Sequence, residues 1–247
     1  MSGTGAGAPA TTLRPGAYAV RIGVTVAFFV GTCAAIVWVG DSWYQLVIAA
    51  VLGVAFTQVA FLAHDGGHQQ IFTRRRSNDR FGQAAGLLTG LSYGWWLGKH
   101  NRHHANPNKE DHDPDIGEGV LAFTTGQVAA RTGRLGRAIT RRQAWLFFPL
   151  LTLEGLNLHA ASVQSLRPGA QRSARGGHRG TEIALLVVHF TVYVSALGAG
   201  RAGVHGGRGE PAYLVEQVCF GVVGQVMGVG QGEVGGAPAH AGAPELR

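Results

Sequence analysis

Residues 43–68 read WYQLVIAAVLGVAFTQVAFLAHDGGH, a hydrophobic stretch that ends in two histidines. From Trp43 to Ala63 the chain carries no charge. A helix of about 20 apolar residues crosses the roughly 30 Å hydrocarbon core of a bilayer. We therefore expect a spanning helix here, and we expect His64 to stand where that helix leaves the membrane.

A second uncharged stretch, from Ile22 to Gly40, comes just before it, and only Asp41-Ser42 separates the two. So short a connection predicts a helical hairpin. Arginines precede the first stretch, at Arg14 and Arg21, and follow the second, at residues 74–76. Because basic residues favour the cytoplasmic side, we expect both flanks of the hairpin to be cytoplasmic.

Two histidine clusters follow hydrophobic stretches, HDGGH at 64–68 and KHNRHH at 99–104. On a helix, residues spaced i, i+3 and i+4 share one face, so each cluster projects from one side of its helix. Neutral imidazole suits zinc, copper, iron or nickel, and the lack of a nearby Cys argues against a Cys-rich zinc site. The metal ligands that we predict are His64, His68, His100, His103 and His104.

Between the clusters, residues 81–98 read FGQAAGLLTGLSYGWWLG, with basic residues on both sides. A single crossing would place the two clusters on opposite faces of the membrane. If the clusters share one site, this segment must dip into the membrane or lie on its surface, where the Trp95-Trp96 pair fits. The alternative is an ordinary third span with unrelated histidine clusters.

Further along, Ala144 to Leu166 is apolar but has arginines on both flanks, and we interpret it as one interfacial or partly buried helix. Residues Ile183 to Gly200 predict another span. Its return partner, Ala212 to Gly230, is a weak candidate because it contains Glu216, and an unpaired carboxylate within a membrane costs a few kcal/mol.

The composition agrees with a membrane protein: 46% of the 247 residues are hydrophobic, and the formal net charge is +7. The basic residues lie between apolar runs and form no nucleic-acid motif, so we expect no nucleic-acid partner. The predicted fold class is all-α and integral to the membrane. We expect transmembrane helical hairpins in a multi-pass protein of the cell membrane whose histidine clusters face the cytoplasm.

Three longer stretches carry a family resemblance: HDGGHQQIF at 64–72, SNDRFG at 77–82 and GLSYGWWLGKHNRHHANPNKEDHDPDI at 90–116. They resemble the first and second histidine boxes, HxxxH and HxxHH, of integral-membrane fatty acid desaturases. The nearest resemblance is to bacterial acyl desaturases related to the front-end group. We assign residues 14–197 to a desaturase domain, after a disordered N-terminus at 1–13.

The resemblance implies four spanning helices, a cytosolic helical domain and a histidine-bound, non-haem di-iron centre. Such an enzyme uses dioxygen, and two electrons from a ferredoxin or cytochrome-type donor, to place a cis double bond in an acyl lipid or acyl-CoA. The five predicted ligand histidines match iron ligands of the family. The resemblance implies no separate catalytic base and no other cofactor.

One part of the family pattern is missing, because no third box (QxxHH or HxxHH) occurs in this sequence. We interpret residues 198–247, an atypical Gly-rich tail, as frameshifted or truncated. Isolated histidines could substitute, although none has box spacing; they are His112, His159, His189, His205 and His240. Because five histidines are too few for two irons, we predict a desaturase with impaired activity. The alternatives are a non-catalytic desaturase remnant, or a hydroxylase or ketolase of the same histidine-box superfamily.

Overall fold

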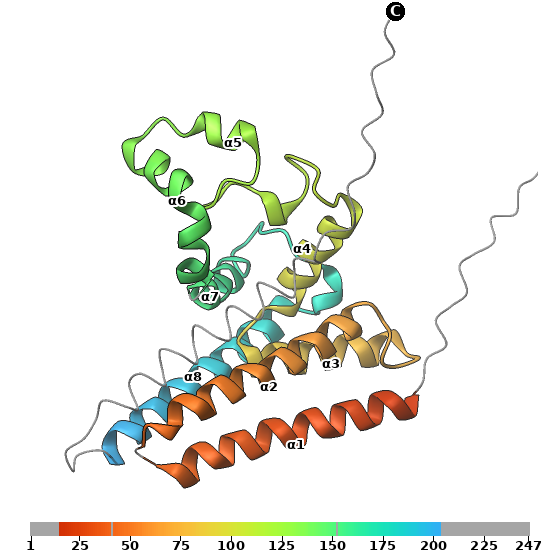
Figure 1. Cartoon of the computed structure of the whole chain (residues 1–247). Helices are drawn as coiled ribbons and strands as arrows, with labels where there is room; N and C mark the ends of the chain where they lie inside the picture. Colours follow the sequence, from red (N-terminus) through yellow and green to blue (C-terminus); the bar gives the residue numbers. More distant parts are fainter. Residues whose placement is uncertain (1–14, 41, 152, 204–247) are drawn as a thin grey trace, which may run out of the picture.

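The computed structural model describes residues 15–40, 42–151 and 153–203. All regular secondary structure in these residues is helical, which confirms the predicted all-α class (Figure 1). The longer helices are α1 (Pro15–Val39), α2 (Tyr44–Gly67), α3 (Arg75–Thr89), α4 (Tyr93–Ala105), α6 (Arg134–Leu151), α7 (Glu154–Gln164) and α8 (Arg179–Gly203). The shorter elements are η1 (Pro114–Ile116), α5 (Thr125–Ala130) and η2 (Ala174–Gly176).

Helices α1 and α2 pack side by side as the predicted hairpin. Gly40 ends α1 in the left-handed conformation, at φ 60°, and the Gln45 amide donates to the carbonyls of Ile36 and Gly40, each at 2.7 Å. Carbonyls at a helix end need such partners because they have none within the helix. Gln45 therefore satisfies carbonyls at the end of α1, so a short connection to α2 is sufficient.

Among the described residues, two helical segments are long and apolar enough to cross a membrane: Gly16–Val39 and Tyr44–Gly67, with mean hydropathies of 2.2 and 2.4. Both extend beyond the uncharged stretches seen in the sequence. Large apolar side chains on this hairpin point outward, with Val37 82% and Trp38 89% exposed. Surface of this kind is stable in hydrocarbon and unfavourable in water.

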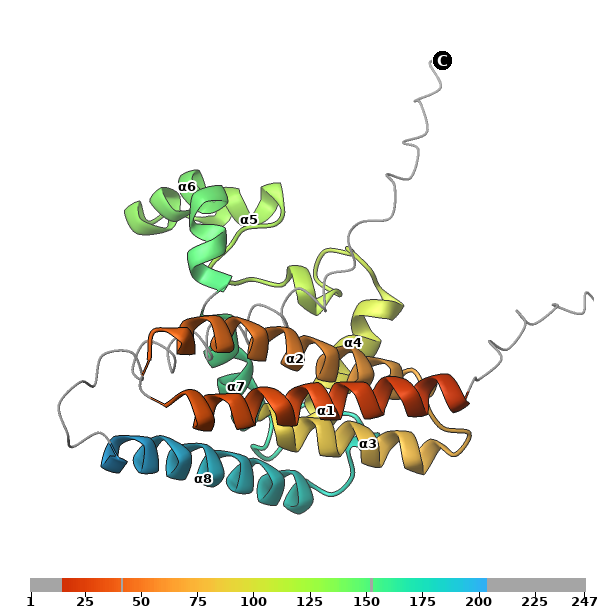
Figure 2. The ribbon, with the colours of Figure 1, turned by 60° about the horizontal axis from the view of Figure 1, so that its bottom comes forward.

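Residues 81–98 form a helical reversal rather than a single crossing helix. Helix α3 runs back along the C-terminal half of α2 and also packs on α8 (Figure 1 and Figure 2). Helix α4 then reverses direction and passes the end of α2, where Trp96 and Leu97 lie against Gly67. Gly90 ends α3 at φ 70°, and the Ser92 hydroxyl caps α4 by accepting from the Trp95 N–H at 3.2 Å. The segment thus returns toward the end of α2, as a shared histidine site requires.

The structure corrects the helix predicted from Ala144 to Leu166. Two helices occupy it, since α6 ends at Leu151 and α7 begins at Glu154. Pro149 lies inside α6, where its ring and missing N–H weaken the last turn. In both views α5 and α6 stand away from the bundle of α1, α2, α3 and α8 (Figure 1 and Figure 2).

The remaining predictions lie in α8 or outside the described residues. The span predicted at 183–200 lies within α8, and the tail predicted to start at 198 begins inside that helix. The N-terminal segment 1–13, the weak span at 212–230 and the remainder of the tail lie outside the part that the structure describes.

Candidate metal centre

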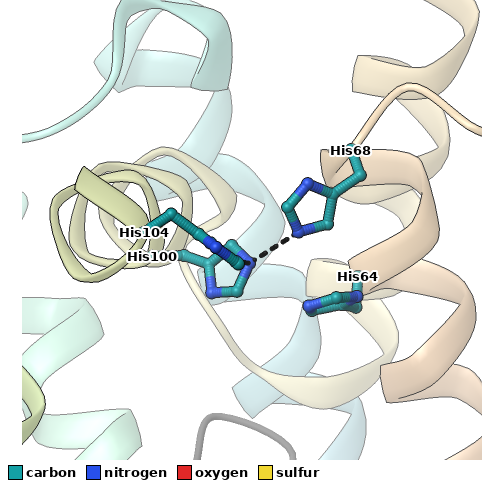
Figure 3. A group of neighbouring side chains, drawn as sticks. All are labelled: His64, His68, His100 and His104. Atoms are coloured by element: carbon teal, nitrogen blue, oxygen red, sulfur yellow. Dashed lines mark hydrogen bonds between the residues drawn. The ribbon is translucent and has the colours of Figure 1, made fainter. Parts of the chain in front are cut away.

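Four of the five predicted ligands meet at the junction of α2 and α4: His64, His68, His100 and His104. Each offers a ring nitrogen, and these nitrogens all lie within 4.8 Å of one another. The His100 Nε2 atom is 2.9 Å from His68 Nε2 and 3.0 Å from His104 Nε2. Figure 3 shows the four rings turned toward one another from the two helices.

The end of α2 is shaped for this approach. His64 lies in the last turn of α2, and His68 caps the helix, with its N–H bonded to the His64 carbonyl at 3.0 Å. Between them, Gly67 faces the ring of Trp96 so closely that a Cβ atom would lie 2.8 Å from Trp96 Cζ3. Glycine is therefore needed here for α4 to reach α2.

Trp96 forms one wall of the cluster. Its ring stacks on His100, with centroids 4.7 Å apart and an interplanar angle of 13°, and it meets His64 edge-on at 6.1 Å. The sequence suggested only an interfacial anchor for the Trp95-Trp96 pair. The contact of Trp96 with His100 follows from their i, i+4 spacing on α4, whereas its contact with His64 of α2 depends on the reversal at Gly90.

His100 is the buried member of the cluster, with 6% of its surface exposed. Burial, and after it the neighbouring imidazoles, chiefly His64, lower the pKa of His100 to about 3. The ring is therefore neutral across the physiological pH range. A neutral imidazole keeps a lone pair for a metal, whereas a protonated one has none.

His103, the fifth predicted ligand, turns its Nδ1 atom toward two carboxylates. This atom lies 3.0 Å from both oxygens of Asp113 and 3.1 Å from Asp115 Oδ2. His103 is not among the four nitrogens that converge, although its ring is 5.7 Å from that of His104. Asp113 and Asp115 were not predicted to be part of the site, although both belong to the stretch NPNKEDHDPDI at 106–116.

Asp113 is fully buried and accepts N–H groups from the backbone on both sides. The N–H of Asn108 lies 2.7 Å from its Oδ2 atom, and the N–H of Asp115 lies 2.9 Å from its Oδ1 atom. Burial alone raises the pKa of Asp113, but these N–H groups and His103 together hold it below its usual value. The carboxylate is therefore ionised and can orient an imidazole.

Three of the isolated histidines that could have substituted as ligands lie elsewhere, whereas His205 and His240 are outside the residues that the structure describes. His112 is exposed and bonds the Glu110 carbonyl at 3.0 Å. His159 and His189 stack on each other and bond the carbonyls of Thr89 and Leu87, at 3.2 and 2.8 Å. This pair caps the end of α3. At about 1.5 Å per residue, the nearby start of α4 at Tyr93 is roughly 10 Å along the helix from His100.

Two partly buried ion pairs fix the loop before α8 against the site. Arg175 donates to Asp79 at 2.8 Å and to the Gly67 carbonyl at 3.1 Å, beside His68. Glu182 pairs with Arg172 and accepts from the Gly94 N–H at 2.6 Å, at the start of α4. Thus the chain near residue 175 supports both helices that carry the histidines.

The donors in this cluster fit a metal ion. Two nitrogens at right angles, each about 2.1 Å from one ion, are about 3.0 Å apart. The separations around His100 Nε2, 2.9 and 3.0 Å, match this value. An all-imidazole set is suited to a transition metal rather than to magnesium or calcium, which prefer oxygen ligands.

Comparison with known proteins gives an independent result. The sequence model of the family described as fatty acid desaturase matches residues 41–245. A Delta(8)-fatty-acid desaturase of Helianthus annuus is 31% identical over 140 residues, covering 52% of this chain and 31% of that protein. An acyl-lipid (8-3)-desaturase of Rebecca salina is 36% identical over 138 residues, covering 55% of this chain and 31% of that protein.

A Delta 8-(E)-sphingolipid desaturase of Emericella nidulans is 30% identical over 178 residues, covering 64% of this chain and 32% of that protein. The chain spans about a third of the length of these relatives. The family match includes both histidine clusters and the helices that bring them together.

Proposed function

Because this chain belongs to the fatty acid desaturase family, we propose that it introduces a cis double bond into an acyl chain, using dioxygen. The observation that carries this proposal is the convergence of four imidazoles from two segments of the chain. The ligand geometry supports a transition-metal site, and the family match supports oxidative chemistry on an acyl chain.

We propose iron as the metal, in a non-haem di-iron centre. His64, His68, His100 and His104 would hold it as the converging set, with His103 as a fifth ligand beside them. Bound iron would supply the activation of dioxygen. We assign no residue as a catalytic base.

The chain's own side chains keep this ligand set in place. His100 stays neutral, and Trp96 covers one face of its ring. The reversal at Gly90 directs α4 toward the end of α2. Rigid placement matters, because the position of the acyl chain relative to the centre decides which C–H bonds react. The net reaction removes two hydrogens from the acyl chain, takes two electrons from a donor and two protons from solvent, and reduces dioxygen to two waters.

The proposed substrate is an acyl lipid or an acyl-CoA, and the proposed electron donor is a ferredoxin or cytochrome-type protein. We also propose a multi-pass placement in the cell membrane with the histidines on the cytoplasmic side. The two apolar helices and the basic residues flanking them support this orientation.

We further propose that the sequence as printed supports reduced activity. Two irons need more nitrogen ligands than the five histidines of the two clusters provide, and no third box occurs in the printed sequence. Iron content and product analysis separate the alternatives. A remnant would bind no iron, and a hydroxylase or ketolase would leave oxygen in its product.

The test is to purify the chain in detergent and measure iron per polypeptide. We expect up to two irons per chain, and near zero in a variant that carries both His64→Ala and His100→Ala. A His112→Ala variant serves as the matched control, because His112 is exposed and outside the cluster. Equal iron in all three proteins, or no iron in the unmodified chain, would overturn the proposal.

A further inference from the structure

We propose that Asp113 is a positioning residue for the metal centre, and that it holds His103 by Nδ1 so that Nε2 serves as the ligand atom. The inference rests on the proposed function. Its basis is the contact of the His103 Nδ1 atom with both Asp113 oxygens, each at 3.0 Å. Because a neutral imidazole bonded through Nδ1–H has its lone pair on Nε2, this contact selects the tautomer that a metal needs.

Asp113 can orient the ring because the backbone already fixes its carboxylate. Its side chain is 0% exposed, and its oxygens accept the N–H groups of Asn108 and Asp115 at 2.7 and 2.9 Å. A carboxylate held at two oxygens cannot rotate away from His103. Carboxylate, histidine and metal in series form a common arrangement, and loss of the carboxylate typically weakens metal affinity by about 10–100-fold.

His103 is also placed on the correct side of its helix. It stands three residues after His100 and one before His104, so its ring borders the cluster. The ring centroids of His103 and His104 are 5.7 Å apart. The ring itself is mostly covered, with 14% of the side chain exposed. A largely covered imidazole next to His104, held from behind by an anion, is placed to join the cluster.

The same three residues could instead form a separate metal site, since His103, Asp113 and Asp115 present ligand atoms within 4.8 Å of one another. Their partners argue against this. Asp115 binds the Lys99 ammonium at 2.8 Å, and this cation would repel a metal ion. Both Asp113 oxygens already accept backbone N–H groups. We therefore assign the carboxylates to His103 and not to an ion of their own.

Asp113→Asn is the direct test, and Asp115→Asn is its matched control on the same imidazole. Asparagine has one oxygen where Asp113 uses two, so its amide nitrogen would face a backbone N–H. Asp115 is more exposed, at 19% of its side chain, and is shared with Lys99, so its loss should matter less. Asp113→Glu keeps the charge if the asparagine variant does not fold.

The measurement is titration of the metal-free full chain, in detergent micelles, with cobalt(II), which takes the same imidazole ligands and can be followed by absorption. We expect Asp113→Asn and Asp113→Glu to weaken binding about 10–100-fold, and Asp115→Asn to cause a much smaller loss. In a His103→Ala background the added Asp113→Asn change should have no further effect, because the carboxylate acts through that ring.

Three results would contradict the assignment. If the unmodified chain and both Asp113 variants bind cobalt with equal affinity, Asp113 does not position a ligand, and the metal centre itself is not called into question. A loss that persists undiminished in the His103→Ala background would show a general structural effect instead. A cobalt ion retained by His64→Ala/His100→Ala and released by Asp115→Asn would reveal a separate site. If the unmodified chain binds no metal, the proposed function fails with it.

Discussion

The Nε2 atoms of His68 and His100 lie 2.9 Å apart, although 32 residues separate them in the chain. This contact exists because α3 runs back along α2 and α4 then returns, so both histidine clusters reach one point. The site therefore depends on the reversal formed by α3 and α4 as much as on the histidine clusters themselves.

Replacing His100 with Ala should remove most of the bound iron. His100 Nε2 has two imidazole neighbours within 3.0 Å, so its loss opens the middle of the ligand set. The loss of affinity should be at least the 10–100-fold typical of residues that only support ligands. Elemental analysis of purified protein measures it. Unchanged iron content would show that the four imidazoles do not bind metal together.

Cysteines at positions 76 and 118 should be labelled from the same side of the membrane. Arg76 and Glu118 are exposed, and they bracket the reversal of α3 and α4. Asn78 is a poorer position because it is buried and bonds the N–H groups of Ile71 and Phe72. The measurement is labelling with a membrane-impermeant maleimide, in a chain whose own cysteines, Cys33 and Cys219, are replaced by Ser.

The control for that experiment is a cysteine at Ser42, in the turn of the α1–α2 hairpin. It should be labelled from the opposite face, because each helix of the hairpin is long enough to cross once. Labelling of positions 76 and 118 from different faces would mean that the segment between the clusters crosses the membrane.

Gly67→Ala should weaken metal binding and lower the melting temperature. The new Cβ atom would lie 2.8 Å from Trp96 Cζ3, so the indole stacked on His100 must move. Overpacking of this kind costs about 1–3 kcal/mol. Gly31→Ala in α1 is the control, since nothing lies within 4 Å of its added atom. It should be neutral or stabilising by up to about 1 kcal/mol. Identical behaviour of the two variants would contradict the packing of α4 on α2.

Glu182→Gln should destabilise the chain by about 3–5 kcal/mol, because it leaves the partly buried Arg172 guanidinium without its partner. Glu182 is 1% exposed and also holds the start of α4 through Ser92 and Gly94. Thermal unfolding in detergent measures the change. The exposed Glu118→Gln should stay within about 0.5 kcal/mol. A melting temperature equal to that of the unmodified chain would show that this ion pair carries little stability.

Expression of the sequence as printed, in a host that lacks the product, should give little or no new unsaturated fatty acid. The five histidines of the two clusters are too few to ligate two irons, and each open position admits water or a stray carboxylate. Gas chromatography of the cellular fatty acids measures the outcome. A clear new unsaturated acid would show that ligands come from elsewhere, with His159, His189, His205 and His240 the first to examine.

The features that depend on local order along the chain could be predicted from the residues alone. Uninterrupted apolar residues on both sides of Asp41-Ser42 predicted the α1–α2 hairpin, because hydrogen bonds within a helix and burial of apolar side chains are set by neighbouring residues. The spacing of His64 and His68, and of His100 and His104, likewise fixed each pair on one helical face. These four predicted ligands are the ones that converge.

The features that depend on residues far apart in the chain could be seen only in the folded protein. The reversal at Gly90, the contact of Trp96 with His64 and the pairing of His103 with Asp113 all follow from packing between separate elements. The helix predicted at 144–166 was wrong for a related reason: its apolar composition hid the break before Glu154. Local periodicity records which face of a helix is apolar, but the free energy that selects its partner comes from contacts that no short stretch of sequence contains.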